Sequence, residues 1–292
     1  MSLANTPNLA DAMHSEFLRS KKWLSRSLVL MGLAYTLSLV TAIRSGEWTQ
    51  YFAMGVLLLQ LVAFLARSAS GSNFDAGETI RRAAMFQDGL GIQPSGARIA
   101  IVVARLGGNA APKAPYLGEY YGSAYPIGPL RLLDICHESA FYTWQLAGRV
   151  VRFLRFALGT GLLLSFLIPV VALQVGLPTS RAESIGKLSV VFISLWTTGE
   201  LAKLYLKFAA LEKASERIVC ESEPLLASSL ATEQAIIIAS EYNCALSCAG
   251  VPIPEWIYGR KKQALDAAVA ARRATARAAC AGSVAYTDSR SA

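Results

Sequence analysis

The residues of this chain that could do chemistry begin with a carboxylate inside an apolar stretch. Glu200 lies near the end of residues 187–208 and follows the hydroxyl side chains of Ser194, Thr197 and Thr198. A carboxylate at membrane depth is costly, so it normally faces a protein interior or a water-filled path rather than lipid. Hydroxyl groups on a membrane helix likewise bond to a neighbouring helix or face water. These four residues are therefore the candidate lining of a cavity or pore.

Glu200 also has a simpler interpretation. Lys203 follows three residues later, and side chains at that spacing lie on the same face of a helix. An ion pair between the two at the membrane edge would only end the apolar segment.

Other reactive side chains are few. His137 beside Glu138 could exchange a proton with it, although two solvated side chains on a helix surface fit the same pattern better. Cys136 beside His137 lacks a second pair at ligand spacing, so no metal site is expected. Cys244 and Cys248 could share a ligand, but without a second His or Cys pair at suitable spacing we predict that they are small core residues. With two histidines in all, and no G-x-S-x-G or H-E-x-x-H motif, we predict no enzyme, metal or cofactor.

The composition indicates which elements must position these residues. Hydrophobic residues make up 53% of the chain and charged residues only 16%, and the apolar residues are clustered. The five cysteines are scattered and odd in number, so they do not indicate a disulfide framework. The net charge of +8 is compatible with a membrane protein, because such proteins concentrate Lys and Arg on the cytoplasmic side.

Four apolar segments are long enough to cross a bilayer, which takes about 20 residues with a range of roughly 17 to 25. We predict an all-α membrane protein whose four transmembrane helices form two hairpins beside a largely helical cytoplasmic region. The predicted helices are Ser27–Ile43, Trp48–Ala66, Phe156–Val175 and Leu188–Tyr205. A cleaved signal peptide is the alternative for the first, and the long polar lead-in argues against it.

The orientation follows from the basic residues. Of the 28 Lys and Arg residues, only Arg44, Arg181 and Lys187 fall in or beside the two short loops. Basic excess marks the cytoplasmic side, so both termini are expected to be cytoplasmic. The predicted divisions are an N-terminal helix (1–26), a first hairpin (27–67), a cytoplasmic segment (68–152), a second hairpin (153–207), a helical tail (208–281) and a disordered C-terminus (282–292).

Several local patterns refine this outline. Residues 68–73 (SASGSN) predict a flexible exit from the membrane, and residues 74–90 predict an amphipathic helix with Arg81 and Arg82 on its outer faces. Pro129 is placed to begin a helix. Residues 207–246 predict one long helix that Pro224 would bend. Two prolines after Gly250 precede a new helix that starts near Glu255, whose later arginines could meet an acidic partner or anionic lipid.

The cytoplasmic segment combines arginine with tyrosine. Guanidinium groups bind phosphate through two hydrogen bonds, and tyrosine rings stack on bases. Candidate ligand-binding residues for a nucleotide are therefore Arg131, Tyr120, Tyr121 and Arg98. The alternative is that the tyrosines pack the soluble core or rest among lipid headgroups.

Two strings in this architecture resemble a known family. They are YYGSAYPIGPLRLLDICHESAFYTWQLAG at residues 120–148 and EYNCALSCAGVPIPEWIYGRKKQAL at residues 241–265. With the order of two spans, a cytoplasmic segment, two spans and a helical tail, the chain resembles the four-transmembrane SMODS-associated effectors of bacterial anti-phage systems. The resemblance implies an antiviral effector in the inner membrane that senses a cyclic oligonucleotide made by a partner nucleotidyltransferase. It also implies that the effector then oligomerises or opens and damages the membrane.

A pore would need several copies of the chain, because one four-helix unit has a packed interior. Ala157, Gly161 and Ser165 recur every fourth residue and form a small-residue face where copies could approach closely. A ring of Glu200 carboxylates would favour cations. The second hypothesis is a membrane scaffold or assembly protein that does not conduct.

Overall fold

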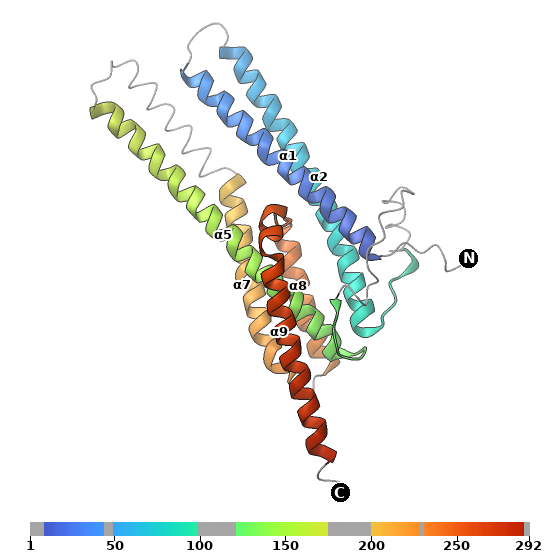
Figure 1. Cartoon of the computed structure of the whole chain (residues 1–292). Coiled ribbons are helices and arrows are strands. Elements are labelled where there is room, and N and C mark those ends of the chain that lie inside the picture. Colours follow the sequence, from blue (N-terminus) through green and yellow to red (C-terminus); the bar gives the residue numbers. More distant parts are fainter. Residues whose placement is uncertain (1–8, 44–48, 98–120, 175–199, 228–230, 289–292) are drawn as a thin grey trace.

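The computed structural model describes residues 9–43, 49–97, 121–174, 200–227 and 231–288, and within these ranges the chain is all-α, with six helices and no strand. The all-α prediction is thereby confirmed. In chain order the helices are α1 (Leu9–Ile43), α2 (Thr49–Leu90), α5 (Pro129–Gln174), α7 (Glu200–Leu226), α8 (Thr232–Ala249) and α9 (Glu255–Asp288). They form an elongated molecule in which α1, α2 and α5 project together beyond the others at one end (Figure 1).

Helices α1 and α2 lie side by side as an antiparallel hairpin (Figure 1). Buried serines hold them together: the Ser20 hydroxyl donates to the Ser70 carbonyl at 2.8 Å, and the Ser70 hydroxyl donates to the Ser20 carbonyl at 2.9 Å. Nearer the tip, the Ser27 hydroxyl donates to the Ala63 carbonyl at 2.9 Å. Small residues at these positions let the two backbones come close.

The predicted flexible exit at residues 68–73 is wrong, because α2 runs through it without a break. Ser70, one of the serines that suggested a loop, is buried and bonds to Ser20 of α1. Helix α1 likewise joins the predicted N-terminal helix and the first apolar segment into one helix of 35 residues. Local composition favoured a break at both places, and packing between the two helices overrides it.

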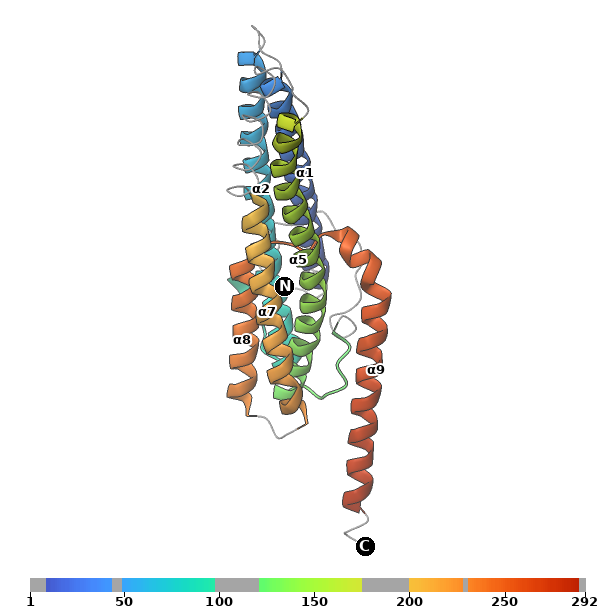
Figure 2. The same cartoon turned by 90° about the vertical axis from the view of Figure 1, so that its left-hand side faces the viewer.

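At the other end, α5, α7 and α8 pack around the main core (Figures 1 and 2). Helix α5 begins at Pro129, as predicted, and continues for 46 residues. The core is lined by aliphatic and aromatic side chains, including Leu132, Ile135, Phe208, Ile218 and Tyr242. The same α5 therefore belongs to the core at its start and to the projecting end at its finish.

The single long helix predicted over residues 207–246 is instead two helices. Helix α7 ends at Leu226, two residues after Pro224, and the Ala227 amide donates to the Pro224 carbonyl at 3.3 Å. Helix α8 then returns along the bundle and ends at Gly250, which has φ 56° and donates to the Leu246 carbonyl at 3.0 Å. A left-handed residue after the last turn is the usual glycine stop of a helix. The fold back buries the apolar face of α8 against α5 and α7.

Exposed apolar side chains gather at the projecting end. They lie on the second half of α1, the first half of α2, the second half of α5 and the first turns of α7, and include Leu33, Leu57, Phe64, Phe156 and Leu206. Exposed patches of this kind mark contact with a membrane or another protein. Among the described residues, α2 is the one helix long and apolar enough to cross a membrane, and only 11% of its most apolar stretch is buried. Association with a membrane is supported by this helix, and the four-span arrangement stays a prediction.

Helix α9 starts beside the middle of α5 and runs down the outside of the bundle, past the ends of α7 and α8 (Figure 2). It buries few apolar side chains, among them Ile257, Leu265 and Val269. Its helical part continues to Asp288, beyond residue 281 where the sequence predicts order to end.

Candidate functional site

A buried ion cluster on α2 is the most concentrated polar site in the described part of the chain. Glu78 and Arg81 lie one turn apart, and their side chains are 5% and 9% exposed. The Arg81 Nε donates to both Glu78 carboxylate oxygens, at 3.1 and 3.0 Å, and Nη2 lies 2.9 Å from Oε2. A buried charge needs such a partner, since an unpaired ion in the interior costs several kcal/mol.

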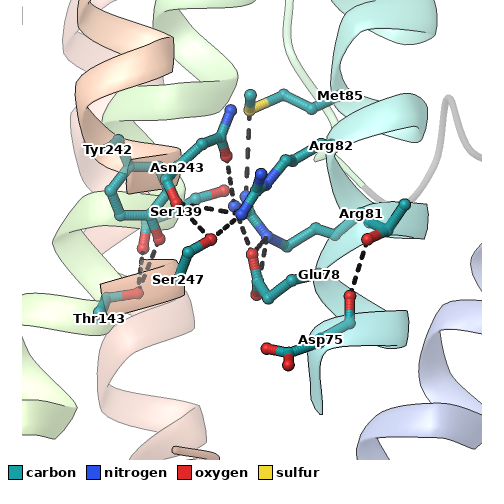
Figure 3. A network of polar contacts seen from close by, with 11 residues as sticks. Asp75, Glu78, Arg81, Arg82, Met85, Ser139, Thr143, Tyr242, Asn243 and Ser247 are labelled. Atoms are coloured by element: carbon teal, nitrogen blue, oxygen red, sulfur yellow. Dashed lines mark hydrogen bonds and ion pairs between the residues drawn. The ribbon is translucent and has the colours of Figure 1, made fainter. Parts of the chain in front are cut away.

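The cluster reaches from α2 to α8. The Arg81 Nη2 donates to the Asn243 amide oxygen at 2.6 Å, and the guanidinium carbon lies 5.2 Å from the centre of the Tyr242 ring. Arg82, the next residue of α2, also contacts α8. Its Nη2 donates to the Asn243 carbonyl at 3.3 Å and contacts the Ser247 hydroxyl. Figure 3 shows both arginines directed from α2 toward α8.

Tyr242 extends the network to α5. Its hydroxyl lies 2.8 Å from the Thr143 hydroxyl, which is also 2.8 Å from the Ser139 carbonyl (Figure 3). Thr143 has a single hydroxyl proton and gives it to that carbonyl, so Tyr242 must be the donor to Thr143. Burial raises the pKa of Tyr242, against the opposing charge of Arg81, so the phenol keeps the proton that this bond needs. Three helices are thus joined through one chain of polar contacts.

The prediction that His137 and Glu138 are both solvated is wrong for His137. His137 is 2% exposed, and its Nδ1 lies 2.8 Å from the Ser222 hydroxyl on α7. Ser222 donates to the Ile218 carbonyl at 2.6 Å, so His137 Nδ1 carries the proton of the histidine–serine bond. Burial lowers the pKa of His137 to about 4, with Arg272 acting in the same direction and Asp134 opposing it. His137 is therefore a neutral core residue.

Glu138 has a different partner from its neighbour. It forms an ion pair with Arg273 of α9, and Arg273 also donates to the Tyr121 carbonyl at 2.5 Å. Arg272 pairs with Asp134 at 2.6 Å. These α9 arginines were expected to meet an acidic partner or anionic lipid, and the structure instead pairs both of them with carboxylates of α5.

The predicted ligand-binding residues are only partly within the described chain. The Arg131 Nη2 pairs with Asp88 at 2.7 Å, and Nη1 donates to the Tyr125 carbonyl at 2.9 Å. Its side chain is 15% exposed, so its donors serve the segment before α5. Tyr121 is buried in the core, as the alternative for the tyrosines expects. Tyr120 and Arg98 lie outside the described residues.

The predicted pore and packing residues can be placed only in part. Ser194, Thr197 and Thr198 lie outside the described residues, and Glu200 is the first residue of α7, with a side chain that is also outside them. The small-residue face lies on α5 near its projecting end, where Ala157 is half-buried and Gly161 is buried; the side chain of Ser165 is not among those described.

The two cysteines of α8 are not core residues, contrary to prediction. Cys244 and Cys248 are both exposed, because α8 turns Ile238, Tyr242 and Leu246 toward the bundle instead. The described residues contain no group of three His, Cys, Asp or Glu side chains that could hold a metal.

Sequence reasoning missed the cluster around Arg81, since it placed Arg81 on an outer face of its helix. A usable signal was present: Glu78 and Arg81 are spaced as an ion pair on the same helix as the apolar residues Ile80 and Met85, which are buried with them. What the sequence could not indicate was that Asn243, 162 residues away, would meet the guanidinium.

No family model matches this chain, and neither a curated protein nor a solved structure is significantly similar to it. The resemblance to the four-transmembrane effectors therefore stays a hypothesis carried by the two strings and the order of segments.

Proposed function

We propose that this chain is an integral membrane protein whose projecting end lies in the bilayer and whose ion-linked bundle lies in the cytoplasm. The observation that carries the proposal is the separation of surfaces along single helices. Helix α2 exposes Leu57 and Phe64 in its first half and buries Glu78 and Arg81 in its second half. An exposed apolar surface is favourable in lipid and unfavourable in water. Four spans with both termini cytoplasmic complete this arrangement.

We further propose that the protein is a membrane effector that responds to a cyclic oligonucleotide and disrupts the inner membrane as an oligomer. The unbroken course of two helices supports this proposal. Helices α2 and α5 each run without a break from the projecting end into the polar network. A rearrangement of the bundle would then move the membrane end as well. Copies would pack through the small-residue face on α5, where Ala157 is half-buried.

The test is dye release from liposomes that contain the purified full-length protein. We expect leakage that depends on an added cyclic oligonucleotide, altered ion selectivity in Glu200→Gln and weaker assembly in Gly161→Leu. Arg217→Gln is the control, because Arg217 is exposed and pairs only with surface carboxylates of α7 and α8. Equal leakage from parent and Glu200→Gln, with the same selectivity, would assign Glu200 to an edge contact with Lys203.

A non-conducting scaffold is the second candidate, and one observation favours it. Arg131, the one candidate phosphate-binding arginine within the described residues, is engaged within the chain: its Nη2 pairs with Asp88 and its Nη1 donates to the Tyr125 carbonyl. A site whose donors are already satisfied has fewer to offer a ligand. Absence of leakage with every nucleotide tried, from protein that is correctly inserted, would select the scaffold.

A further inference from the structure

We propose that the boundary between the two ends is a binding surface for the headgroups of anionic phospholipids, formed by α1, α5 and the first turns of α9. This inference rests on the proposed membrane location. The surface, called here the basic collar, consists of Lys22 and Arg26 on α1, Arg152 and Arg155 on α5, and Arg260 and Lys262 on α9. All six residues are exposed.

Direct contacts place the three helices at one level. Lys21 of α1 forms an ion pair with Glu255 at the start of α9, and its amine lies 5.4 Å from the centre of the Tyr258 ring. Trp256, the residue after Glu255 in α9, packs its ring edge-on against Phe153 of α5, with 5.3 Å between the ring centres. The first turn of α9 therefore bridges the α1/α2 hairpin and α5, and the collar residues lie within about two helical turns of these contacts.

That level coincides with the start of the exposed apolar surface. Immediately beyond the collar, α1 exposes Val29 and Leu33, and α5 exposes Phe156. On α9, Trp256 is half exposed, and the Arg260 guanidinium lies 5.9 Å from its ring centre. On α1, the Arg26 guanidinium lies 4.8 Å from the centre of the Trp23 ring. Tryptophan with adjacent cations is the combination that suits the headgroup region of a bilayer.

The charge and the apolar surroundings of the basic collar indicate which ligand it would bind. Six exposed cations beside an apolar surface match a partner that is acidic and apolar at once, which describes an anionic phospholipid and not a free anion in water. Each basic side chain near a membrane surface contributes about a fivefold gain in affinity for anionic lipid. The arginines further along α9, by contrast, are paired with carboxylates and lie away from this boundary.

The experiment uses full-length protein in nanodiscs of phosphatidylcholine, with and without phosphatidylglycerol, and counts retained lipids by native mass spectrometry. We expect the parent to retain phosphatidylglycerol preferentially at low salt. Arg260→Gln/Lys262→Gln should weaken this retention by up to about 25-fold, from two charges at roughly fivefold each. Amide hydrogen exchange over residues 255–262 should slow when phosphatidylglycerol is added to the parent and stay unchanged in the double variant.

Arg217→Gln is the matched control, because it removes an exposed arginine eleven residues past the exposed apolar Leu206 on α7, about 16 Å further along the helix. Retention in this control should equal that of the parent. Equal retention in the parent and the double variant would overturn the collar while leaving membrane insertion intact. Displacement of the lipid by millimolar inorganic phosphate would also overturn it, by showing a site for free anions. Extraction of the parent from membranes by alkaline carbonate would instead refute the proposed membrane location itself.

Discussion

The two halves of α2 differ in what their surroundings must supply. In the first half, Leu57 and Phe64 are exposed and need only an apolar medium, so they place no demand on any particular residue. In the second half, Arg81 needs the Glu78 carboxylate, the Asn243 oxygen and the Tyr242 ring at defined positions. Apolar burial has no direction, whereas a buried ion is tolerated only in one geometry. Registry between the hairpin and the bundle is therefore set at the charged half.

Replacing Arg81 should give the largest effect. Arg81→Met leaves the Glu78 carboxylate buried without its partner, which costs about 3 to 5 kcal/mol of unfolding free energy. Thermal unfolding of the detergent-solubilised protein would measure the loss. Glu78→Gln/Arg81→Met removes both charges and should recover much of it. If Arg81→Met costs no more than Arg82→Gln, the cluster does not set the registry.

A charge placed on the apolar half should come next. We expect Leu57→Lys to lower the inserted fraction, because a lysine near the centre of a membrane helix costs about 2.5 to 3.5 kcal/mol. Thr79→Lys is the control on the same helix, at an exposed position of the charged half, and should change insertion little. Carbonate extraction of membranes that carry each variant gives the fractions. Equal insertion of the two variants would contradict a lipid-facing first half.

Lowering the pH should reduce the unfolding free energy of the bundle gradually. The pKa of His137 is about 4 in the folded chain and near 6.5 when unfolded, so the unfolded state binds more protons between those values. The contribution of neutral His137 is complete above pH 6.5 and is lost as the pH falls toward 4, a change of about 3 kcal/mol. Melting temperatures across this range should fall in the parent.

The comparison variants for this pH effect use the only two histidines of the chain. His137→Gln should flatten the decline between pH 6.5 and 4. His14→Gln alters an exposed residue of α1 and should keep the decline of the parent. A decline that persists unchanged in His137→Gln would assign the acid sensitivity to other groups.

The features that the sequence determined by itself depend on residues close to one another along the chain. Apolar composition and helix signals predicted an all-α chain, the helix start at Pro129 and the start near Glu255. These features depend on backbone conformation and on the few residues around each start, which a single sequence displays. The exposed apolar half of α2 falls in the same class, because its composition is visible without knowledge of the fold.

The tertiary structure decided which faces are covered. Residues 68–73 stay helical because Ser70 meets Ser20, and the chain divides after Pro224 because α8 can return to the core. Arg81 is buried because α8 supplies Asn243, and Cys244 is exposed because α8 turns a different face toward the bundle. In each case the deciding partner lies far away in sequence. Periodicity identifies an apolar face but cannot name the helix that will cover it, because that choice depends on packing between distant segments.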